Sequence, residues 1–264
     1  MILVLDIGNT NMSIGVFGDD SCEAAESLVV HARFSSVDRT PDEAGLLLEN
    51  LLRSHGVDAG SIDGAILCSV VPRLEAVWRE GIRTYFNVKA IVVSNKLDLG
   101  MRVDIDIPDE VGADRLANAV AAAEKYGCPV VAVDLGTAIN IDVVSAEGCY
   151  IGGAIAPGLS TSVQTLFSRT AKLPQVALDA PPRVIGRNTI HAIQSGIVYG
   201  YTGLVDELVE RVFLELGTKT PVIATGGQAE ILASNSRTIT NVDQWLTLDG
   251  LRIIFRRNKS KNVL

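Results

Sequence analysis

The sequence predicts an α/β fold made of two similar halves, and two observations carry this prediction. Short apolar runs alternate with amphipathic helical segments along the 264 residues, a pattern typical of sheets covered by helices. One pattern also occurs twice, at 3–10 and 131–138: an apolar strand, an aspartate, one apolar residue, a glycine and a small polar residue. We therefore expect an internal duplication with lobes at 1–118 and 119–264. Because no Ser/Gly-rich tether separates the lobes, we also expect a cleft between them.

The first half is expected to begin with a β-hairpin. Apolar runs at 2–7 and 14–17 flank the turn Gly8-Asn9-Thr10-Asn11, which favours two antiparallel strands. Thr40 followed by Pro41 and two acidic residues predicts the start of a helix. The other segments expected from the same signals are strands at 29–34, 65–68 and 90–93, and helices at 72–85 and from Pro108 to a stop at Gly127.

The second half repeats the strand pattern of the first. Its expected elements are strands at 130–134, 139–144, 150–155 and 222–224, and helices at 159–167, at 189–216 and from Gln228. A glycine turn, Thr225-Gly226-Gly227, follows the last of these strands. The basic run at 252–261 is expected to be the solvated end of a helix.

Composition excludes several classes of function. The chain has 23 Lys and Arg against 31 Asp and Glu, a net charge of −8, so it is a poor candidate for nucleic-acid binding. No apolar run approaches the ~20 residues that cross a bilayer, and no basic segment precedes the apolar start, so neither a membrane span nor a secretory signal is expected. Four scattered cysteines and three distant histidines favour reduced thiols in the cytoplasm and argue against a zinc site.

The paired hairpins are the best candidates for phosphate binding. Gly-Lys never occurs, and no two glycines are separated by one residue, so the Walker A loop and the dinucleotide fingerprint are absent. A glycine turn after a strand instead offers successive N–H groups to an anion. Asp6 and Asp134 end the two strands, and Mg²⁺ prefers one or two carboxylates together with phosphate oxygens. An acidic chain therefore has a local way to bind a nucleotide.

These motifs resemble the phosphate hairpins and adenosine-side loop of the actin, sugar kinase and Hsp70 ATPase superfamily. Within it, the chain resembles type III pantothenate kinase. The resemblance extends from Asp6 to about Gly227. The superfamily motifs are Asp6-Ile7-Gly8-Asn9-Thr10-Asn11, Asp134-Leu135-Gly136-Thr137-Ala138 and Thr225-Gly226-Gly227; the family motifs are Ser69-Val70-Val71-Pro72, Val111-Gly112-Ala113-Asp114-Arg115-Leu116, Gly152-Gly153-Ala154-Ile155-Ala156-Pro157-Gly158, Gly186-Arg187-Asn188-Thr189-Ile190 and Gln194-Ser195-Gly196.

The resemblance implies the actin-like ATPase fold, with two duplicated ribonuclease H-like lobes, each a mixed sheet flanked by helices. It implies ATP-dependent phosphorylation of pantothenate to 4′-phosphopantothenate, the first step of coenzyme A biosynthesis. It also implies Mg²⁺, a monovalent cation (K⁺ or NH₄⁺) and a homodimer in which Thr189 contacts pantothenate across the interface. The implied site residues are Asp114 as catalytic base; Asp6, Ile7, Gly8, Asn9, Thr10, Asn11, Met12, Ser13 and Thr137 for the nucleotide; Ile105, Gly112, Ala113, Asp114, Arg115 and Thr189 for the substrate; and Asp134 and Asp6 for cations.

Two departures from the family pattern leave an alternative open. The family's run of threonines in the second hairpin is replaced by Thr137-Ala138-Ile139-Asn140, and its tyrosine three residues before Pro108 is replaced by Ile105. Both changes remove hydroxyl groups near the expected site. The alternative is a paralogue with the same fold and weak or altered activity, acting as a regulatory or binding protein or as a kinase of another small alcohol.

Overall fold

The structure, a computed structural model, describes residues 1–18, 28–168 and 176–259. Its contacts divide the chain into two compact units, which we describe separately. The first contains Met1–Arg102, Asp106–Ala121 and the chain from Leu246 onward, and the second contains Val103–Ile105 and Ala122–Trp245. The break after Ala121 lies three residues from the expected lobe boundary, but the C-terminal segment joins the first unit rather than the second.

A five-stranded mixed sheet forms the centre of the first unit. Its order is β3-β2-β1-β4-β5; β2 is antiparallel to β1 and β3, whereas β4 is parallel to β1 and β5. The expected hairpin is present, and Asp6 is directly opposite Ser13 in its register. The strand bounds are β1 Ile2–Ile7, β2 Asn11–Phe17, β3 Leu28–Ser35, β4 Gly64–Ser69 and β5 Ile91–Val92.

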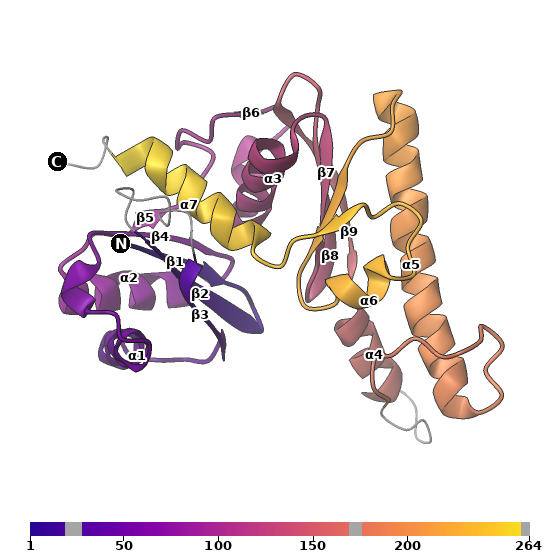
Figure 1. The fold of residues 1–264 in the computed structure, drawn as a ribbon, viewed down its shortest axis with the longest axis horizontal. Helices are drawn as coiled ribbons and strands as arrows, with labels where there is room; N and C mark the ends of the chain where they lie inside the picture. Colours follow the sequence, from indigo (N-terminus) through magenta and orange to yellow (C-terminus); the bar gives the residue numbers. More distant parts are fainter. Residues whose placement is uncertain (19–27, 169–175, 260–264) are drawn as a thin grey trace. The chain divides into compact units, whose positions relative to one another are not determined.

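Helices cover both faces of this sheet (Figure 1). On one face, α1 (Pro41–Ser54) and α2 (Pro72–Phe86) form an apolar core with the side chains of Leu3, Leu5 and Ile7. The capping box at the start of α1 is complete, because Thr40 accepts from the Glu43 main chain and the Glu43 carboxylate accepts from Thr40. On the other face lies α7 (Leu246–Asn258).

The second sheet repeats the first. Its order is β11-β10-β7-β8-β9-β6, with β8 antiparallel to β7 and β9 and with β10 parallel to β7 and β11. Strands β9-β8-β7-β10-β11 therefore correspond to β3-β2-β1-β4-β5, and the expected duplication is confirmed in the strand order. The bounds are β6 Arg102–Val103, β7 Val130–Leu135, β8 Ala138–Val144, β9 Cys149–Pro157, β10 Val222–Thr225 and β11 Asn241–Val242.

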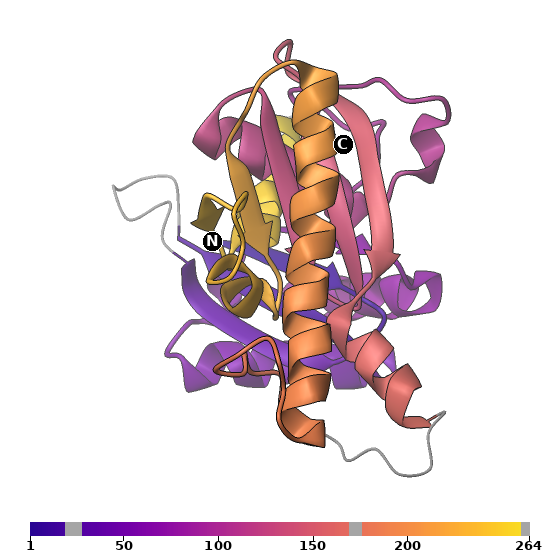
Figure 2. The same cartoon turned by 90° about the vertical axis from the view of Figure 1, so that its right-hand side faces the viewer.

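The long helix α5 (Thr189–Leu216) runs along one face of this sheet (Figure 2). Its N-cap is Asn188, which accepts from the His191 main chain, and it ends at Gly217, whose φ is 70°. The shorter helices are α4 (Leu159–Ser168) and α6 (Ala229–Ala233). The fold class expected from the sequence, an α/β chain of two duplicated lobes each built on a mixed sheet, is confirmed.

Two sequence predictions were wrong. The helix expected from Pro108 is divided: Pro108–Glu110 forms only a 3₁₀ turn (η3), and α3 spans Ala113–Tyr126. The break occurs because Val111 is extended, with φ −70° and ψ 128°. The basic run at 252–261 does not begin in solvent either, because Arg252 is buried and its guanidinium lies 5.3 Å from the centre of the Phe17 ring. Lys259 is exposed, as expected, and Lys261 lies outside the described residues. A second 3₁₀ turn, η2, spans Ala59–Ser61.

The expectations about membrane spans and about free thiols can be compared with the structure only for the described residues. No helix among the described residues is long and apolar enough to cross a bilayer. Cys68, Cys128 and Cys149 are free thiols, as expected, and Cys22 lies outside the described residues.

Candidate active site

The first hairpin ends in a tight glycine turn. Gly8 N–H donates to the Asn11 carbonyl at 3.0 Å, and a Cβ on Gly8 would lie 2.9 Å from that oxygen. Ser36, just after β3, fixes the turn from outside: its Oγ donates to Gly8 O at 2.6 Å and its N–H to Thr10 O at 3.0 Å. The side chains of Asn9 and Thr10 are exposed. The turn is therefore rigid and presents polar groups to solvent.

Asp6 lies just before this turn in a strongly perturbed environment. Its Oδ1 accepts from the Cys68 thiol at 3.2 Å. Burial, followed by the negative charge of Asp114, raises the pKa of Asp6 from 3.8 to about 6, while the Cys68 bond and the Arg33 charge oppose the rise. Two carboxylates that repel one another provide the conditions under which a cation is bound. Burial likewise raises the pKa of the Cys68 thiol well above its ordinary value.

Asp114 is held in the first turn of α3 by its local backbone. Its Oδ1 accepts from the Arg115 main chain at 2.9 Å. A Cβ on Gly112 would lie 2.5 Å from the same oxygen, so a larger residue at that position would displace the carboxylate. Gly112, Ala113 and Arg115 are half-buried around it. The structure thus gathers Asp6, Asp114 and the glycine turn in the first unit.

The second hairpin also ends in a glycine turn, one residue shorter than the first. Gly136 N–H donates to the Ala138 carbonyl at 3.0 Å. The Thr137 carbonyl accepts from Gly158 N–H at 3.0 Å and from Thr161 Oγ1 at 2.8 Å. The turn is therefore fixed by the start of α4, while the Thr137 side chain is exposed.

The glycine turn after β10 packs against Asp134. Gly226 has a φ of 92°, and a Cβ there would lie 2.6 Å from Asp134 Oδ1. The Gln228 main-chain N–H donates to the Leu135 carbonyl at 3.2 Å. The Gln228 side chain makes two further contacts: its nitrogen donates to Leu135 O at 2.8 Å, and its oxygen accepts from Ser160 Oγ at 3.2 Å. Asp134, the second hairpin and this turn therefore form one cluster in the second unit.

The remaining predicted residues are more scattered. The side chains of Ile7 and Met12 are buried in the apolar core of the first unit, so only their main chains are available to a ligand. Asn11 and Ser13 are half-buried on β2. Ile105 belongs to the second unit, where its Cγ2 would lie 3.7 Å from a Cβ on Gly152. Thr189 is exposed at the first position of α5.

Sequence reasoning missed Cys68, Ser36 and Gln228 as supports of these clusters. Two of them were identifiable in part: Cys68 is the last buried residue of an apolar run, and Gln228 directly follows the glycine turn at 225–227. Ser36 carried no signal, because its role depends on the register of β3 with β2.

The carboxylates present fit one kind of metal site. Among residues 1–18, 28–168 and 176–259, no group of three or more His, Cys, Asp or Glu side chains is placed to hold a metal ion. This arrangement does not suit a metal bound by protein alone. It does suit Mg²⁺ held by one or two carboxylates and completed by phosphate oxygens and water.

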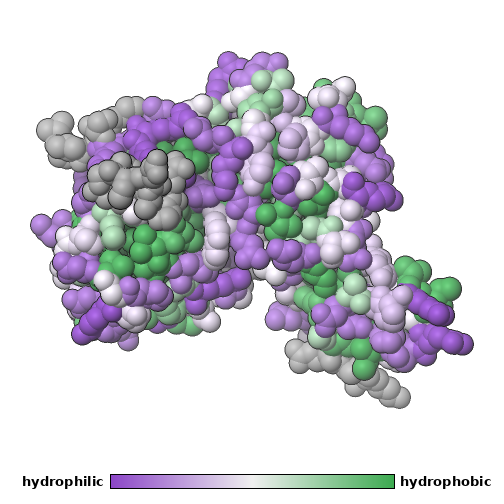
Figure 3. Space-filling view, in the orientation of Figure 1, coloured by the Kyte–Doolittle hydropathy of each residue, from purple (hydrophilic) through white to green (hydrophobic). Residues whose placement is uncertain are grey.

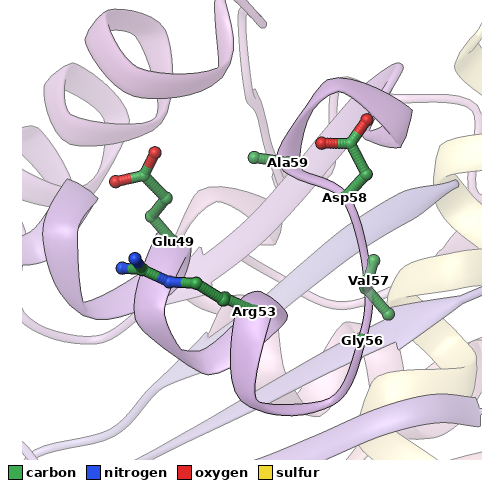
Figure 4. Close-up of a pocket in the computed structure, with 6 residues that line it drawn as sticks. All are labelled: Glu49, Arg53, Gly56, Val57, Asp58 and Ala59. Carbon is green, nitrogen blue, oxygen red and sulfur yellow. The ribbon is translucent and has the colours of Figure 1, made fainter.

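One further hollow of about 380 Å³ lies at the end of α1 (Figure 4). Glu49 and Arg53 line it from the helix, and residues 56–59 line it from the following loop. It contains no residue of the hairpins or of α3, so it is separate from the candidate active site.

The duplicated mixed sheets, each with an aspartate before a glycine turn, define a protein of the actin-like kinase and ATPase fold. Solved structures agree with this class. A protein described as a Baf family transcriptional activator from Campylobacter jejuni matches with a TM-score of 0.58 at 21% identity, covering 98% of this chain and 99% of that one. A 2-dehydro-3-deoxygalactonokinase from Sinorhizobium meliloti matches with a TM-score of 0.58 at 12% identity, covering both chains completely.

Sequence comparisons identify the family within this fold. The family model described as type III pantothenate kinase matches residues 2–211. A type III pantothenate kinase of Roseiflexus sp. (strain RS-1) is 48% identical over 98% of this chain and 100% of its own length, and one of Pelobacter propionicus is 47% identical with the same coverage. The chain belongs to the type III pantothenate kinase family, and it is a kinase.

Proposed function

We propose that this protein transfers the terminal phosphoryl group of ATP to pantothenate, giving 4′-phosphopantothenate in the first step of coenzyme A biosynthesis. The observation that carries the proposal is the nearness of Asp114 to Asp6, whose carboxyl its charge affects, beside a rigid glycine turn, in a chain of this family. Phosphoryl transfer needs positioned phosphates, neutralised charge and a carboxylate that accepts the proton of the attacking hydroxyl. The first unit contains groups suited to each of these tasks.

In the proposed mechanism, Asp114 is the base. Its carboxylate accepts the proton of the primary alcohol of pantothenate while the alcohol oxygen attacks the terminal phosphorus, and ADP leaves. Asp6 and the main chain of residues 7–13 bind the phosphates, and Thr137 binds the nucleotide from the second hairpin. Asp6 would hold Mg²⁺ together with phosphate oxygens, and the ion would supply charge neutralisation for the transferred group. Asp134 would hold a monovalent cation, K⁺ or NH₄⁺.

The substrate pocket is proposed to surround the start of α3. Arg115 binds the carboxylate of pantothenate, because a guanidinium fork matches two carboxylate oxygens. Gly112 and Ala113 leave room for the backbone of the substrate, and Ile105 adds an apolar contact where the family usually has a tyrosine. Thr189 completes the pocket of a partner subunit.

A homodimer is supported by the surface around Thr189. Val184, Ile185 and Ile190 are 64%, 80% and 48% exposed, and Figure 3 shows hydrophobic colouring over the loop that precedes α5. The loop is held against the helix, because Ser195 Oγ donates to Val184 O at 2.6 Å. A rigid apolar surface of this kind is typical of a subunit interface. We propose that the dimer acts in the cytoplasm.

The decisive experiment is an ADP-release assay with purified protein, ATP, Mg²⁺ and K⁺, with and without pantothenate. The proposal expects ADP formation that depends on pantothenate and a product that carries one added phosphate by mass spectrometry. If no pantothenate-dependent ADP forms at any cation concentration, the proposal is wrong. The paralogue alternative is not favoured, because relatives with 44–48% identity over nearly the whole chain are described as type III pantothenate kinases.

A further inference from the structure

The edge strand β3 places an arginine in line with Asp6. Asp6 is directly opposite Ser13 on β2, and Ser13 is directly opposite Arg33 on β3. On the other side, Asp6 is opposite Cys68 on β4. Side chains directly opposite one another on neighbouring strands lie on the same face of a sheet. Arg33, Ser13, Asp6 and Cys68 therefore form a single polar row on one face.

This polar row lies next to the part of the face that α7 covers. A Cβ on Gly15 would lie 3.1 Å from the Leu248 side chain, and one on Gly64 would collide with the Phe255 ring. Gly15 and Gly64 are opposite the early residues Val4 and Ile2 of β1, whereas Asp6 is near the end of that strand. The glycine turn follows directly, so the row adjoins the phosphate-binding part of the hairpin.

Arg33 has the charge and reach needed for this position. Two strand spacings separate it from Asp6, about 10 Å between main chains, and its positive charge acts on Asp6, lowering the pKa of that carboxyl against the effect of Asp114. Its side chain is exposed, and no hydrogen bond or ion pair to the described part of the chain occupies its guanidinium. The guanidinium is therefore available to a ligand.

We propose that Arg33 binds the terminal phosphate of the nucleotide. The inference rests on the proposed function, because Asp114, the proposed base, marks where the terminal phosphoryl group reacts. A guanidinium matches the geometry of two phosphate oxygens and stays charged at every working pH. In a chain of net charge −8, a cation in the same row as Asp6 offsets the repulsion that a polyphosphate meets from this carboxylate.

The test is nucleotide binding, measured by calorimetry with Mg²⁺ and without pantothenate. Arg33→Gln is expected to weaken ATP binding about 10- to 100-fold, the range of a lost hydrogen bond between charged groups, while ADP and AMP affinities change less than threefold. Arg33→Lys keeps the charge without the fork, so its ATP affinity falls between those of Arg33→Gln and the parent protein. Arg53→Gln is the matched control, because α1 packs on the opposite face of the sheet; it should bind all three nucleotides normally.

Two results would overturn the inference. One is parental ATP affinity in Arg33→Gln; the other is an equal loss for ATP, ADP and AMP, which would mean that the terminal phosphate is not the contact. If Arg33→Gln fails to fold by circular dichroism, Arg33→Lys decides: unchanged ATP affinity in that variant contradicts the proposal. Failure of the proposed function can be distinguished from failure of this inference. In the first case the parent protein forms no ADP that depends on pantothenate, and the comparison of nucleotide binding between the variants still tests Arg33.

Discussion

A Cβ atom on Gly250 would collide with the main-chain oxygen of Ala117, so α7 and α3 pack backbone against backbone at this point. Thr247 Oγ1 donates to Asn118 Oδ1 at 2.7 Å in the same contact. Asp114 is one turn earlier on α3. The C-terminal helix therefore fixes the position of the helix that carries the proposed base.

We expect Gly250→Ala to lower both stability and activity. The added methyl group forces the two helices apart, and overpacking of this kind costs about 1–3 kcal/mol. The shift moves Asp114, so kcat should fall more than the affinity for ATP. Thermal unfolding and steady-state kinetics measure the two effects. Unchanged kcat in a destabilised variant would show that the contact does not position Asp114.

Asp114→Asn should lower kcat about 10²- to 10⁴-fold, the usual contribution of a general base. The amide keeps the shape of the side chain but accepts no proton from pantothenate. Because Asp114 raises the pKa of Asp6, its neutralisation should preserve or strengthen ATP binding. Single-turnover kinetics and calorimetry separate the two quantities. Normal turnover would disprove the assignment of the base.

Asp6→Asn should stabilise the ligand-free protein while abolishing its activity. The pKa of Asp6 is about 6 in the folded state against an ordinary 3.8, so the folded protein binds this proton more tightly than the unfolded chain does. The free energy of unfolding therefore falls as pH rises from about 4 to 6, and the loss persists at higher pH. The variant should gain about 1–3 kcal/mol relative to the parent at pH 8 and almost nothing at pH 4. Denaturant unfolding at both pH values checks the sign.

Gly226→Ala and Gly127→Ala form a matched pair in the second unit. Both glycines have positive φ, 92° and 80°, but only Gly226 is close to another group: its Cβ would lie 2.6 Å from Asp134 Oδ1, while space around Gly127 is open. Backbone strain alone should cost each variant about 1–2 kcal/mol. Gly226→Ala should additionally weaken nucleotide binding and the response to K⁺. Equal nucleotide affinity and equal response to K⁺ in the two variants would show that Asp134 is not part of the site.

Magnesium should bind tightly only together with nucleotide. Among the described residues no three-ligand protein site is present, so phosphate oxygens must complete the coordination. We expect ATP affinity to fall by an order of magnitude or more in EDTA, and Mg²⁺ alone to give little heat in calorimetry. ATP binding that is unaffected by EDTA would contradict a role for Asp6 as a cation ligand.

Much of the fold was predictable because its signals are local. The strand of apolar residues before Asp6 and the similar strand before Asp134 indicated the duplication, and Thr40 with Pro41 predicted the start of α1. The helix start near Pro108 was mispredicted because the tertiary position of Asp114 requires an extended Val111 and a glycine at 112, which local propensity does not reveal. The packing of the C-terminal helix on the first sheet was not predictable, because its partners, Gly15 and Gly64, are about 190–230 residues away in the sequence.

The candidate site was predictable in its motifs but not in its neighbours. Asp6, Gly8 and Asp114 belong to recognisable sequence blocks. The polar row that connects Asp6 to Cys68 and Arg33 depends on strand register, a long-range property that a single sequence does not display. The same holds for Gly226, since only the parallel pairing of β10 with β7 brings it to Asp134.

The place of α7 has a consequence for biosynthesis. The strands of the first sheet are synthesised early in translation. The helix that covers the Asp6 face of this sheet, Leu246–Asn258, is synthesised near the end. A nascent chain of about 240 residues therefore exposes the apolar surface around Val4 and Ile66.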